Sequence, residues 1–552
     1  MNDRTDVVVV GAGLAGLVAA TELGDAGRRV VVVDQEGENS LGGQAWWSLG
    51  GLFLVDSPEQ RRLGIHDSRE LALQDWMGTA RFDRPEDEWP RRTAEAFIEF
   101  AAGEMRPWLH AQGMRWFPVP GWAERGGVLA DGHGNSVPRF HVTWGTGPGV
   151  LAPFVRRVRA HVEAGRVELR FRHRVTRLLV TTGRVEGVAG EILAPAKVAR
   201  GRRSNRDVTG AFELGASAVI VASGGLGANL ELVRRHWPVD RLGPAPAEML
   251  SGVPHHVDGR MLDVSAAAGA ALVNTDRMWH YTEGVGNWSP IWPNHGIRIL
   301  SGPSPIWIDA RGDRLPPPCL PGFDTPSTLQ RILSSGHTHS WFVLNRRIAE
   351  KEIALSGSEQ NPDLTSGGWW SVLRQRLSPG PPGPVQKFLD EGEDWLTGPA
   401  LEPLVERMNA LAGDPRIDPA HLRAQIEARD REIGNPFSKD AQVVALRGAR
   451  RYLGDRFVRT ARPHRILDPR HGPLVAVRLR VLTRKCLGGI HVNLDGQALD
   501  EEGRAIPGLY AVGEVAGFGG GGYHGYGALE GTFLGGCIFG GRRAGRHAAR
   551  HV

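Results

Sequence analysis

Runs of hydrophobic residues near the start of the chain predict buried parallel strands. Residues 7–10 and 30–33 are all valine, and residues 216–222 form a third, largely apolar run. Strands that are apolar at every position are typical of parallel sheets covered on both faces. A helix-like stretch ending at Gly27 separates the two valine runs. The N-terminus therefore predicts a strand, a helix and a second strand parallel to the first.

The pattern changes along the chain and indicates two domains. Apolar residues recur at close to a 3.6-residue period over 86–112, which predicts a helix. Tryptophan, proline and turn-forming residues dominate from about 276 to 380, and 384–435 is predicted to be helical. An insertion at a surface loop is physically tolerated. We therefore predict one nucleotide-binding domain split in the sequence, with a second domain inserted into it: 1–275 and 484–552 for the first, and 276–483 for the second.

A glycine-rich turn joins the first strand to the helix. Gly11 permits a tight turn, Gly13 lets the backbone approach a pyrophosphate, and Gly16 lets the helix pack closely on the strand. The helix N-terminus offers free N–H groups to phosphates, and Asp34 ends the second strand, where it can accept from ribose hydroxyls. This order predicts dinucleotide binding, but the turn alone does not distinguish FAD from NAD.

Composition and charge narrow the class of protein. The chain has 552 residues, 23% of them charged, and a formal net charge of only +5. No dense basic run with interleaved aromatic residues is present, so we expect no nucleic-acid binding. Three widely spaced cysteines indicate a reducing compartment and no metal cluster. The chain enters its first strand directly and its longest apolar runs are too short to span a bilayer, so we expect no integral membrane segment and a cytoplasmic location.

Four motifs, taken in order, resemble one flavoprotein superfamily. They are GAGLAG at 11–16, LGGQAWWSLGG at 41–51, VIVASGGLGAN at 219–229 and IPGLYAVGE at 506–514. Together they resemble the succinate dehydrogenases, fumarate reductases and 3-ketosteroid dehydrogenases. The resemblance implies an α/β fold: a Rossmann-like FAD-binding domain of the glutathione-reductase type, with an inserted α+β capping domain. It also selects FAD over NAD.

The resemblance implies a set of cofactor-binding positions. The N-terminal glycines would hold the ADP part, the second glycine segment would line the phosphates and the flavin, and the last helix would direct its N-terminal dipole at the flavin. The full set is Gly11, Ala12, Gly13, Ala15, Gly16, Asp34, Gln35, Gly42, Gly43, Gln44, Ser48, Gly50, Gly51, Val175, Ala222, Ser223, Gly224, Asn229, Gly513, Glu514, Gly531 and Thr532. In the respiratory enzymes the position of Gln44 carries the histidine that bonds covalently to flavin. Glutamine cannot form that bond, so we expect non-covalent FAD.

The glycine loop near the C-terminus favours one subtype of this superfamily. The dicarboxylate enzymes have an arginine where this chain has Ala528, so fumarate and succinate are disfavoured as substrates. The loop from Tyr523 to Ala528 instead matches the Y-x-G-x-G-A form of the ketosteroid dehydrogenases. By that resemblance, Tyr523 would assist enolisation of a ketone and the Gly527 N–H would donate to the carbonyl oxygen. The substrate would be a small-molecule carbonyl compound.

Other positions leave the catalytic assignment open. Arg314 matches the proton-donor arginine of the dicarboxylate reductases, with a structural ion pair as the alternative. Two tyrosines of the ketosteroid enzymes have no equivalent, so no base is assigned. Candidates by chemistry alone are His280, Tyr281, Glu283, His295 and His524.

The predicted activity is removal of hydrogen from a CH–CH bond next to a carbonyl, or the reverse ene reduction. A flavin oxidase or monooxygenase and a non-catalytic electron carrier are the alternatives. The electron acceptor and the oligomeric state are not predicted.

Overall fold

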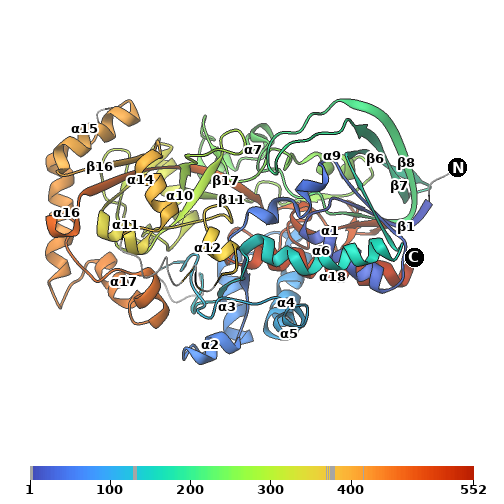
Figure 1. The fold of residues 1–552 in the computed structure, drawn as a ribbon, viewed down its shortest axis with the longest axis horizontal. Coiled ribbons are helices and arrows are strands. Elements are labelled where there is room, and N and C mark those ends of the chain that lie inside the picture. The colour runs from blue at the N-terminus through green and yellow to red at the C-terminus, as the bar shows by residue number, and fades with distance from the viewer. Residues whose placement is uncertain (1–3, 128–133, 369, 371, 373–379, 415) are drawn as a thin grey trace.

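Two sheets of eight strands each organise the protein, in a computed structural model that describes residues 4–127, 134–368, 370, 372, 380–414 and 416–552. Figure 1 shows them towards opposite ends of an elongated molecule, with both chain termini at the end of the first sheet. The main path of the first sheet runs in the order β19-β20-β8-β1-β2-β5. Its strands are β1 (Arg4–Val10), β2 (Val30–Asp34), β5 (Val167–Phe171), β8 (Val208–Val221), β19 (Gln497–Leu499) and β20 (Ala505–Ala511).

The centre of the first sheet is parallel, as the valine runs predict. β1 lies between β2 and β8 and pairs in parallel with both. On the outer sides, β2 pairs in parallel with β5, and β8 pairs in parallel with β20. An antiparallel extension, β6 (His173–Thr181) and β7 (Arg184–Leu193), joins the sheet through β8. The C-terminal strand β20 therefore completes a sheet that the N-terminus begins.

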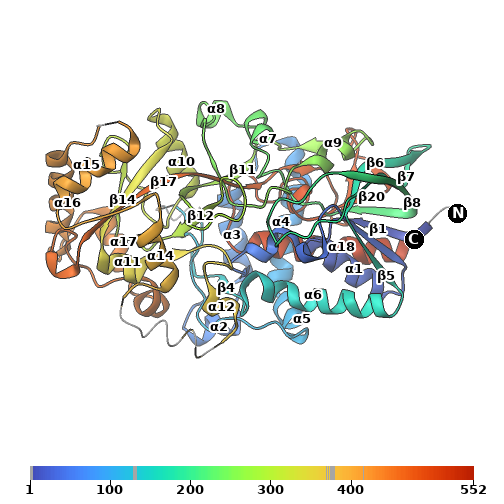
Figure 2. The ribbon, with the colours of Figure 1, turned by 45° about the horizontal axis from the view of Figure 1, so that its top comes forward.

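Helices from distant parts of the chain pack together beside this sheet. α1 (Leu14–Asp25) contacts both α6 (Thr146–Glu163) and the C-terminal α18 (Thr532–His551). Figures 1 and 2 both show these three helices running together along the first sheet. Because α18 closes against α1, the two ends of the chain share one hydrophobic core.

The second sheet is antiparallel apart from one short pair. Its main path runs in the order β13-β14-β17-β11-β12-β15, and β9 pairs with β17 in parallel. The long strand β17 lies at the centre and also pairs with β16. The strands are β9 (Leu250–Ser251), β11 (Met278–Gly286), β12 (Gly296–Leu300), β13 (Ile306–Asp309), β14 (His339–Asn345), β15 (Ala354–Leu355), β16 (Trp395–Gly398) and β17 (Leu474–Cys486).

Two predicted helical regions are divided in the structure. Region 384–435 comprises α14 (Gly383–Glu391), strand β16, α15 (Leu401–Ala412) and α16 (Pro419–Ile433). β16 forms because it pairs with β17, which is distant in sequence, so the local pattern does not contain this signal. Region 86–112 is divided at Gly103 into α4 (Glu88–Ala102) and α5 (Met105–Ala111).

Shorter elements connect and cover the two sheets. They are α2 (Pro58–Arg62), α3 (Arg69–Ala80), α7 (Leu230–Arg235), α8 (Val239–Leu242), α9 (Arg260–Ala266), α10 (Thr325–Ser334), α11 (Arg346–Glu352), α12 (Pro362–Thr365), α17 (Ala441–Ala449), β3 (Gly51–Phe53), β4 (Phe140–Val142), β10 (Leu272–Val273) and β18 (Gly489–Ile490).

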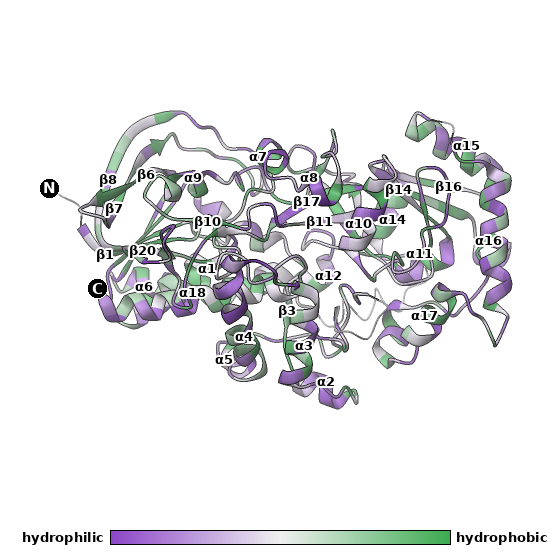
Figure 3. Ribbon diagram, turned by 180° about the vertical axis from the view of Figure 1, so that it is seen from behind, coloured by the Kyte–Doolittle hydropathy of each residue, from purple (hydrophilic) through white to green (hydrophobic). Residues whose placement is uncertain are grey.

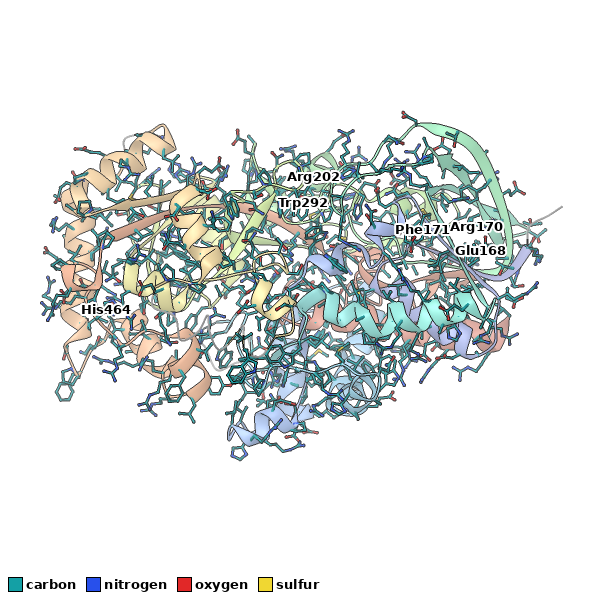
Figure 4. All side chains as sticks on the ribbon, viewed as in Figure 1. Glu168, Arg170, Phe171, Arg202, Trp292 and His464 are labelled. Atoms are coloured by element: carbon teal, nitrogen blue, oxygen red, sulfur yellow. The ribbon has the colours of Figure 1, made fainter. Side chains whose placement is uncertain are left out.

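The distribution of polarity agrees with this layering. Figure 3 shows hydrophobic residues concentrated in the interior and hydrophilic residues along the outer helix α16. The side chains in Figure 4 place Glu168, Arg170 and Phe171 on β5 at one end of the molecule, and His464 at the other end near α16. No helix in the described ranges is long and apolar enough to cross a membrane.

Candidate functional site

A cavity opens where the parallel strands of the first sheet end. About 970 Å³ of space, open in part to solvent, lies between residues that follow β1, β2, β8 and β20. Ligands in α/β proteins bind at this edge of the sheet. We call it the first cavity. It is lined by fourteen of the predicted cofactor-binding residues: Gly11, Gly13, Ala15, Asp34, Gln35, Gly42, Gly43, Gln44, Val175, Ala222, Ser223, Gly224, Gly513 and Glu514.

The three fingerprint glycines have different surroundings. A Cβ atom on Gly11, whose φ is +107°, would lie 2.5 Å from the Ala222 carbonyl oxygen. A Cβ on Gly16 would lie only 2.0 Å from the Gly11 carbonyl oxygen. Beside Gly13 the closest heavy atom would be 4.0 Å away, so this position faces open space in the first cavity. Gly11 and Gly16 therefore permit the turn and its packing, and Gly13 leaves room for a ligand.

The start of helix α1 suits a phosphate. Its N-cap, Gly13, supplies no side-chain hydrogen bond, and the first turn contains no acidic residue. The unpaired N–H groups and the helix dipole at such an end favour an anion. The residues present therefore fit the diphosphate of a dinucleotide.

Asp34 holds the turn as well as facing the first cavity. Its carboxylate accepts from the backbone N–H groups of Ala12 and Glu36, at 2.8 Å each. Burial raises the pKa of Asp34 above its ordinary value. A carboxylate has about four lone-pair sites, so Asp34 can still accept from a ribose hydroxyl.

The first cavity has lining residues that sequence reasoning missed. Beyond the predicted set it is lined by side chains such as His173, Arg174, His256, Asp258 and Arg260. Asp258 lies two residues before the start of α9, next to its N-cap Gly259. Nothing in the local sequence pattern brings the β6 residues His173 and Arg174 to this edge.

A second cavity joins the first at Gln44, Ala45, Glu514 and Cys537, which line both. About 860 Å³ of space, open in part to solvent, lies between strands β11, β12 and β17 of the second sheet and the start of α18. The predicted residues Ser48, Gly50, Gly51 and Gly531 line it. Helix α18 begins at this cavity after Gly531, whose φ is +89°, with no side-chain cap, so its N–H groups are available to an anion.

The junction between the cavities is a charged, hydrogen-bonded group. Lys485 Nζ donates to Gln44 Oε1 at 2.8 Å and lies 3.5 Å from Glu514 Oε2. The Gln44 amide donates to Glu514, which also accepts from the Cys486 backbone N–H at 3.1 Å. Gln44 is thus engaged at both ends of its amide, and its side chain has no nucleophilic atom.

A buried cluster on the wall of the second cavity combines donors and carboxylates. Arg298 on β12 lies 2.5 Å from Glu530 Oε1, and the Tyr281 hydroxyl on β11 donates to the same oxygen at 3.2 Å. The Arg298 guanidinium lies 3.9 Å from the centre of the Tyr281 ring. All three side chains line the second cavity. From the sequence, Tyr281 is a candidate only because of its side-chain chemistry, and Arg298 is not predicted. A single charged residue between Ile297 and Ile299 is the signal that could have identified Arg298.

Two further carboxylates approach the same arginine. Glu124 lies 3.4 Å and Glu283 lies 3.6 Å from Arg298 nitrogens. Burial raises the pKa of Glu124 well above its ordinary value and also raises the pKa of Glu283. One guanidinium cannot balance three buried carboxylates, so burial favours the protonated forms of Glu124 and Glu283, while Glu530 has the shortest contact with Arg298. Burial likewise raises the pKa of the Tyr281 phenol, which therefore stays protonated.

The structure does not place Tyr523 where the motif predicts. Its side chain is fully buried, packs against Trp76 and Phe97, and donates to the Thr532 carbonyl oxygen at 2.6 Å. Neither Tyr523 nor Gly527 lines either cavity. The aromatic core beneath the loop surrounds the tyrosine ring, so the catalytic roles of Tyr523 and Gly527 stay predictions that this geometry does not favour.

Arg314 also lies outside both cavities. It forms a two-pronged ion pair with Asp440 at 2.6 and 2.9 Å and donates to Gln442 at 2.7 Å. The structural alternative expected for Arg314 is the one the structure shows.

Four of the predicted cofactor-binding residues line neither cavity: Ala12, Gly16, Asn229 and Thr532. Asn229 caps α7, where its side chain accepts from the Leu232 N–H at 3.2 Å. The Thr532 hydroxyl contacts the ring of His524 at 2.8 Å. Ala12 and Gly16 belong to the glycine turn already described.

Fold and site together define an FAD-binding flavoprotein. The chain belongs to the FAD binding domain family, whose model it matches over residues 6–534. It is 60% identical to a KsdD-like steroid dehydrogenase of Mycolicibacterium smegmatis over 547 residues, which cover 99% of each chain. It is 59% identical to a KsdD-like steroid dehydrogenase of Mycobacterium tuberculosis over 547 residues, covering 99% of this chain and 96% of the relative.

A solved structure has the same fold over its full length. The 3-ketosteroid delta1-dehydrogenase from Sterolibacterium denitrificans, in complex with 1,4-androstadiene-3,17-dione, is 17% identical with a TM-score of 0.69, and the match covers 100% of both chains. The resemblance inferred from the four motifs is confirmed, and the cofactor is FAD.

Proposed function

We propose that the protein is an FAD-dependent dehydrogenase that removes hydrogen from a CH–CH bond next to the carbonyl of a 3-ketosteroid. The observation that carries the proposal is the junction of the two cavities at Gln44 and Glu514. A cofactor held by the first cavity can reach the second, whose wall carries Tyr281, Arg298 and Glu530. The relatives of about 60% identity are named as steroid dehydrogenases, which supports a steroid as the substrate.

The proposed domain arrangement follows the two sheets. Segments 1–275 and 484–552 form a Rossmann-like FAD-binding domain around the first sheet, and 276–483 forms a capping domain around the second. Strand β17 extends past the second boundary to Cys486, and β9 of the first segment pairs with it. The substrate would enter between the two domains.

Each residue of the proposed catalytic cluster has one role. When bound, FAD supplies the acceptor for a hydride from the carbon β to the carbonyl. The protonated Tyr281 hydroxyl and the Arg298 guanidinium donate to the carbonyl oxygen, which stabilises enolate charge as it develops. The Glu530 carboxylate accepts the proton from the carbon α to the carbonyl. Glu124 and Glu283 hold the charge of this cluster close to neutral.

The substrate class can be tested by anaerobic reduction of the bound flavin. We expect 3-ketosteroids to bleach the flavin absorbance, and succinate to leave it unchanged, because Ala528 stands where the dicarboxylate enzymes have an arginine. Stopped-flow absorbance at the flavin maximum measures the rate. Bleaching by small enones but by no steroid would contradict the substrate assignment while leaving the reaction class in place.

FAD is expected to leave the protein on denaturation. Gln44 occupies the position of the covalent attachment in the respiratory enzymes, and its amide is held by Lys485 and Glu514. After acid precipitation, flavin absorbance should be recovered in the supernatant. Colour retained in the washed pellet would show a covalent bond elsewhere and contradict the prediction.

A further inference from the structure

Exposed hydrophobic side chains concentrate on one segment of the protein. Residues 434–462, which we call the edge segment, include helix α17. Four of the ten exposed large hydrophobic residues in the described ranges belong to it: Phe437, Val444, Leu453 and Phe457, exposed by 87, 52, 47 and 67%. Phe437 is the most exposed of the ten. Single exposed hydrophobic residues are ordinary, whereas exposed hydrophobic residues that gather together mark interaction surfaces, which makes this segment the candidate.

The outward charge of the edge segment is entirely positive. It contains seven Lys and Arg residues and two Asp residues, a formal charge of +5. Both carboxylates form ion pairs within the protein, Asp440 with Arg314 at 2.6 Å and Asp455 with Arg125. The exposed charged residues are the cations Lys439, Arg451, Arg456 and Arg462.

Hydrogen bonds hold the edge segment on the body of the protein. Arg447 donates to the carbonyl oxygens of Ile433 and Asn435, at 3.2 and 2.8 Å, at the end of α16. Lys351 donates to the Phe457 carbonyl oxygen. These hydrogen bonds attach the edge segment to the end of α16 and to Lys351 on α11.

The edge segment is connected to the second cavity through one loop. The Tyr452 hydroxyl donates to the Pro120 carbonyl oxygen at 2.5 Å, and Asp455 pairs with Arg125. Between these two contacts, Ala123 lines the second cavity. Figure 1 shows α17 on an outer edge of the molecule. Any surface that binds the edge segment would therefore lie close to the loop that lines the second cavity.

We propose that the edge segment docks on the surface of a lipid bilayer that contains anionic headgroups. Two phenylalanines and two aliphatic side chains would enter the boundary of the acyl chains, while arginines and lysine contact phosphates, as in monotopic proteins. A symmetric dimer through this face would oppose one cationic surface with another, which disfavours a second copy as the occupant. The docking does not depend on the proposed chemistry.

Vesicle sedimentation of the FAD-loaded protein tests this proposal. We expect binding to phosphatidylcholine vesicles that contain about one third phosphatidylglycerol, and weak binding to phosphatidylcholine alone. Raising the salt concentration should weaken the binding, because the contacts between cations and headgroups are screened. The double variant Phe437→Ser, Phe457→Ser should reduce the partition coefficient by about tenfold or more. The matched control is Trp288→Ser, an exposed aromatic residue outside the edge segment, which should bind as the unchanged protein does.

A second variant and a second measurement keep the test decisive. Arg451→Glu with Arg456→Glu reverses two exposed charges and should abolish the preference for phosphatidylglycerol. Flavin content and melting temperature report whether each variant is folded. Equal binding of both variants and the unchanged protein, or no binding to anionic vesicles, would overturn the proposal. So would a dimer in analytical ultracentrifugation that the Phe437 and Phe457 substitutions dissociate, since a second copy would then occupy the face.

Discussion

Replacing Tyr281 by phenylalanine is expected to slow flavin reduction by a 3-ketosteroid by about two orders of magnitude, the size of effect expected when one donor to a developing enolate oxygen is lost. The substitution removes the hydroxyl that lies 3.2 Å from Glu530 and leaves the ring under Arg298 in place. The rate constant for anaerobic flavin reduction, measured at saturating steroid, reports the loss directly. Steroid affinity should change by only a few fold, since the ring that lines the cavity is retained.

Tyr523→Phe is the matched control for this experiment. Both tyrosines are buried, and both lose one hydroxyl with no change in ring volume. The Tyr523 hydroxyl donates to a carbonyl oxygen of the chain itself, so its loss should lower stability by about 1 kcal/mol and leave the rate within a few fold. The reverse outcome, a slow Tyr523→Phe and a normal Tyr281→Phe, would restore the role that the glycine-loop motif suggests and remove Tyr281 from the mechanism.

Gly13→Val is expected to give a folded protein that has lost FAD. The φ of Gly13 is −76°, which any residue adopts, and nothing in the protein lies within 4.0 Å of the added Cβ except the Ala222 carbonyl oxygen at that distance. The new side chain therefore occupies the space left for the diphosphate. We expect FAD affinity to fall by about a hundredfold or more, which corresponds to roughly 3 kcal/mol. The ratio of flavin to protein absorbance and titration of the purified apoprotein measure this change.

Gly16→Ala distinguishes a lost ligand from a lost fold. A Cβ here would lie 2.0 Å from the Gly11 carbonyl oxygen, so the helix and the turn cannot keep their packing. This variant should lose both FAD and thermal stability, whereas Gly13→Val should melt like the unchanged apoprotein. If Gly13→Val retained a full complement of FAD, the first cavity would not be the site of the diphosphate.

The parts of this protein that could be predicted from the sequence are those whose local structure is determined by residues close together in the chain. The valine runs, the glycine turn and Asp34 lie within 34 residues, and local sterics and periodicity describe them well. The four motifs extend this prediction to the first cavity, because each forms one wall of it.

The second cavity could not be predicted in the same way. Arg298 meets Glu530 across 232 positions of the sequence, through strands that no local pattern aligns. The glycine-loop motif places Tyr523 in the correct loop, but the direction of its ring depends on Trp76 and Phe97, far away in the chain. Arg314 likewise matches a sequence motif, but its side chain forms an ion pair with Asp440, directly before α17, and this partner is distant in the sequence.

Strand β17 connects the second sheet to the junction between the two cavities. It is the central strand of the second sheet, and it ends beside Gln44 and Glu514 with Lys485, the cation of that junction. Any displacement of the second sheet would move this ammonium relative to Gln44 and Glu514. The shape of the second cavity and the charge at its junction with the first cavity are therefore coupled through a single strand.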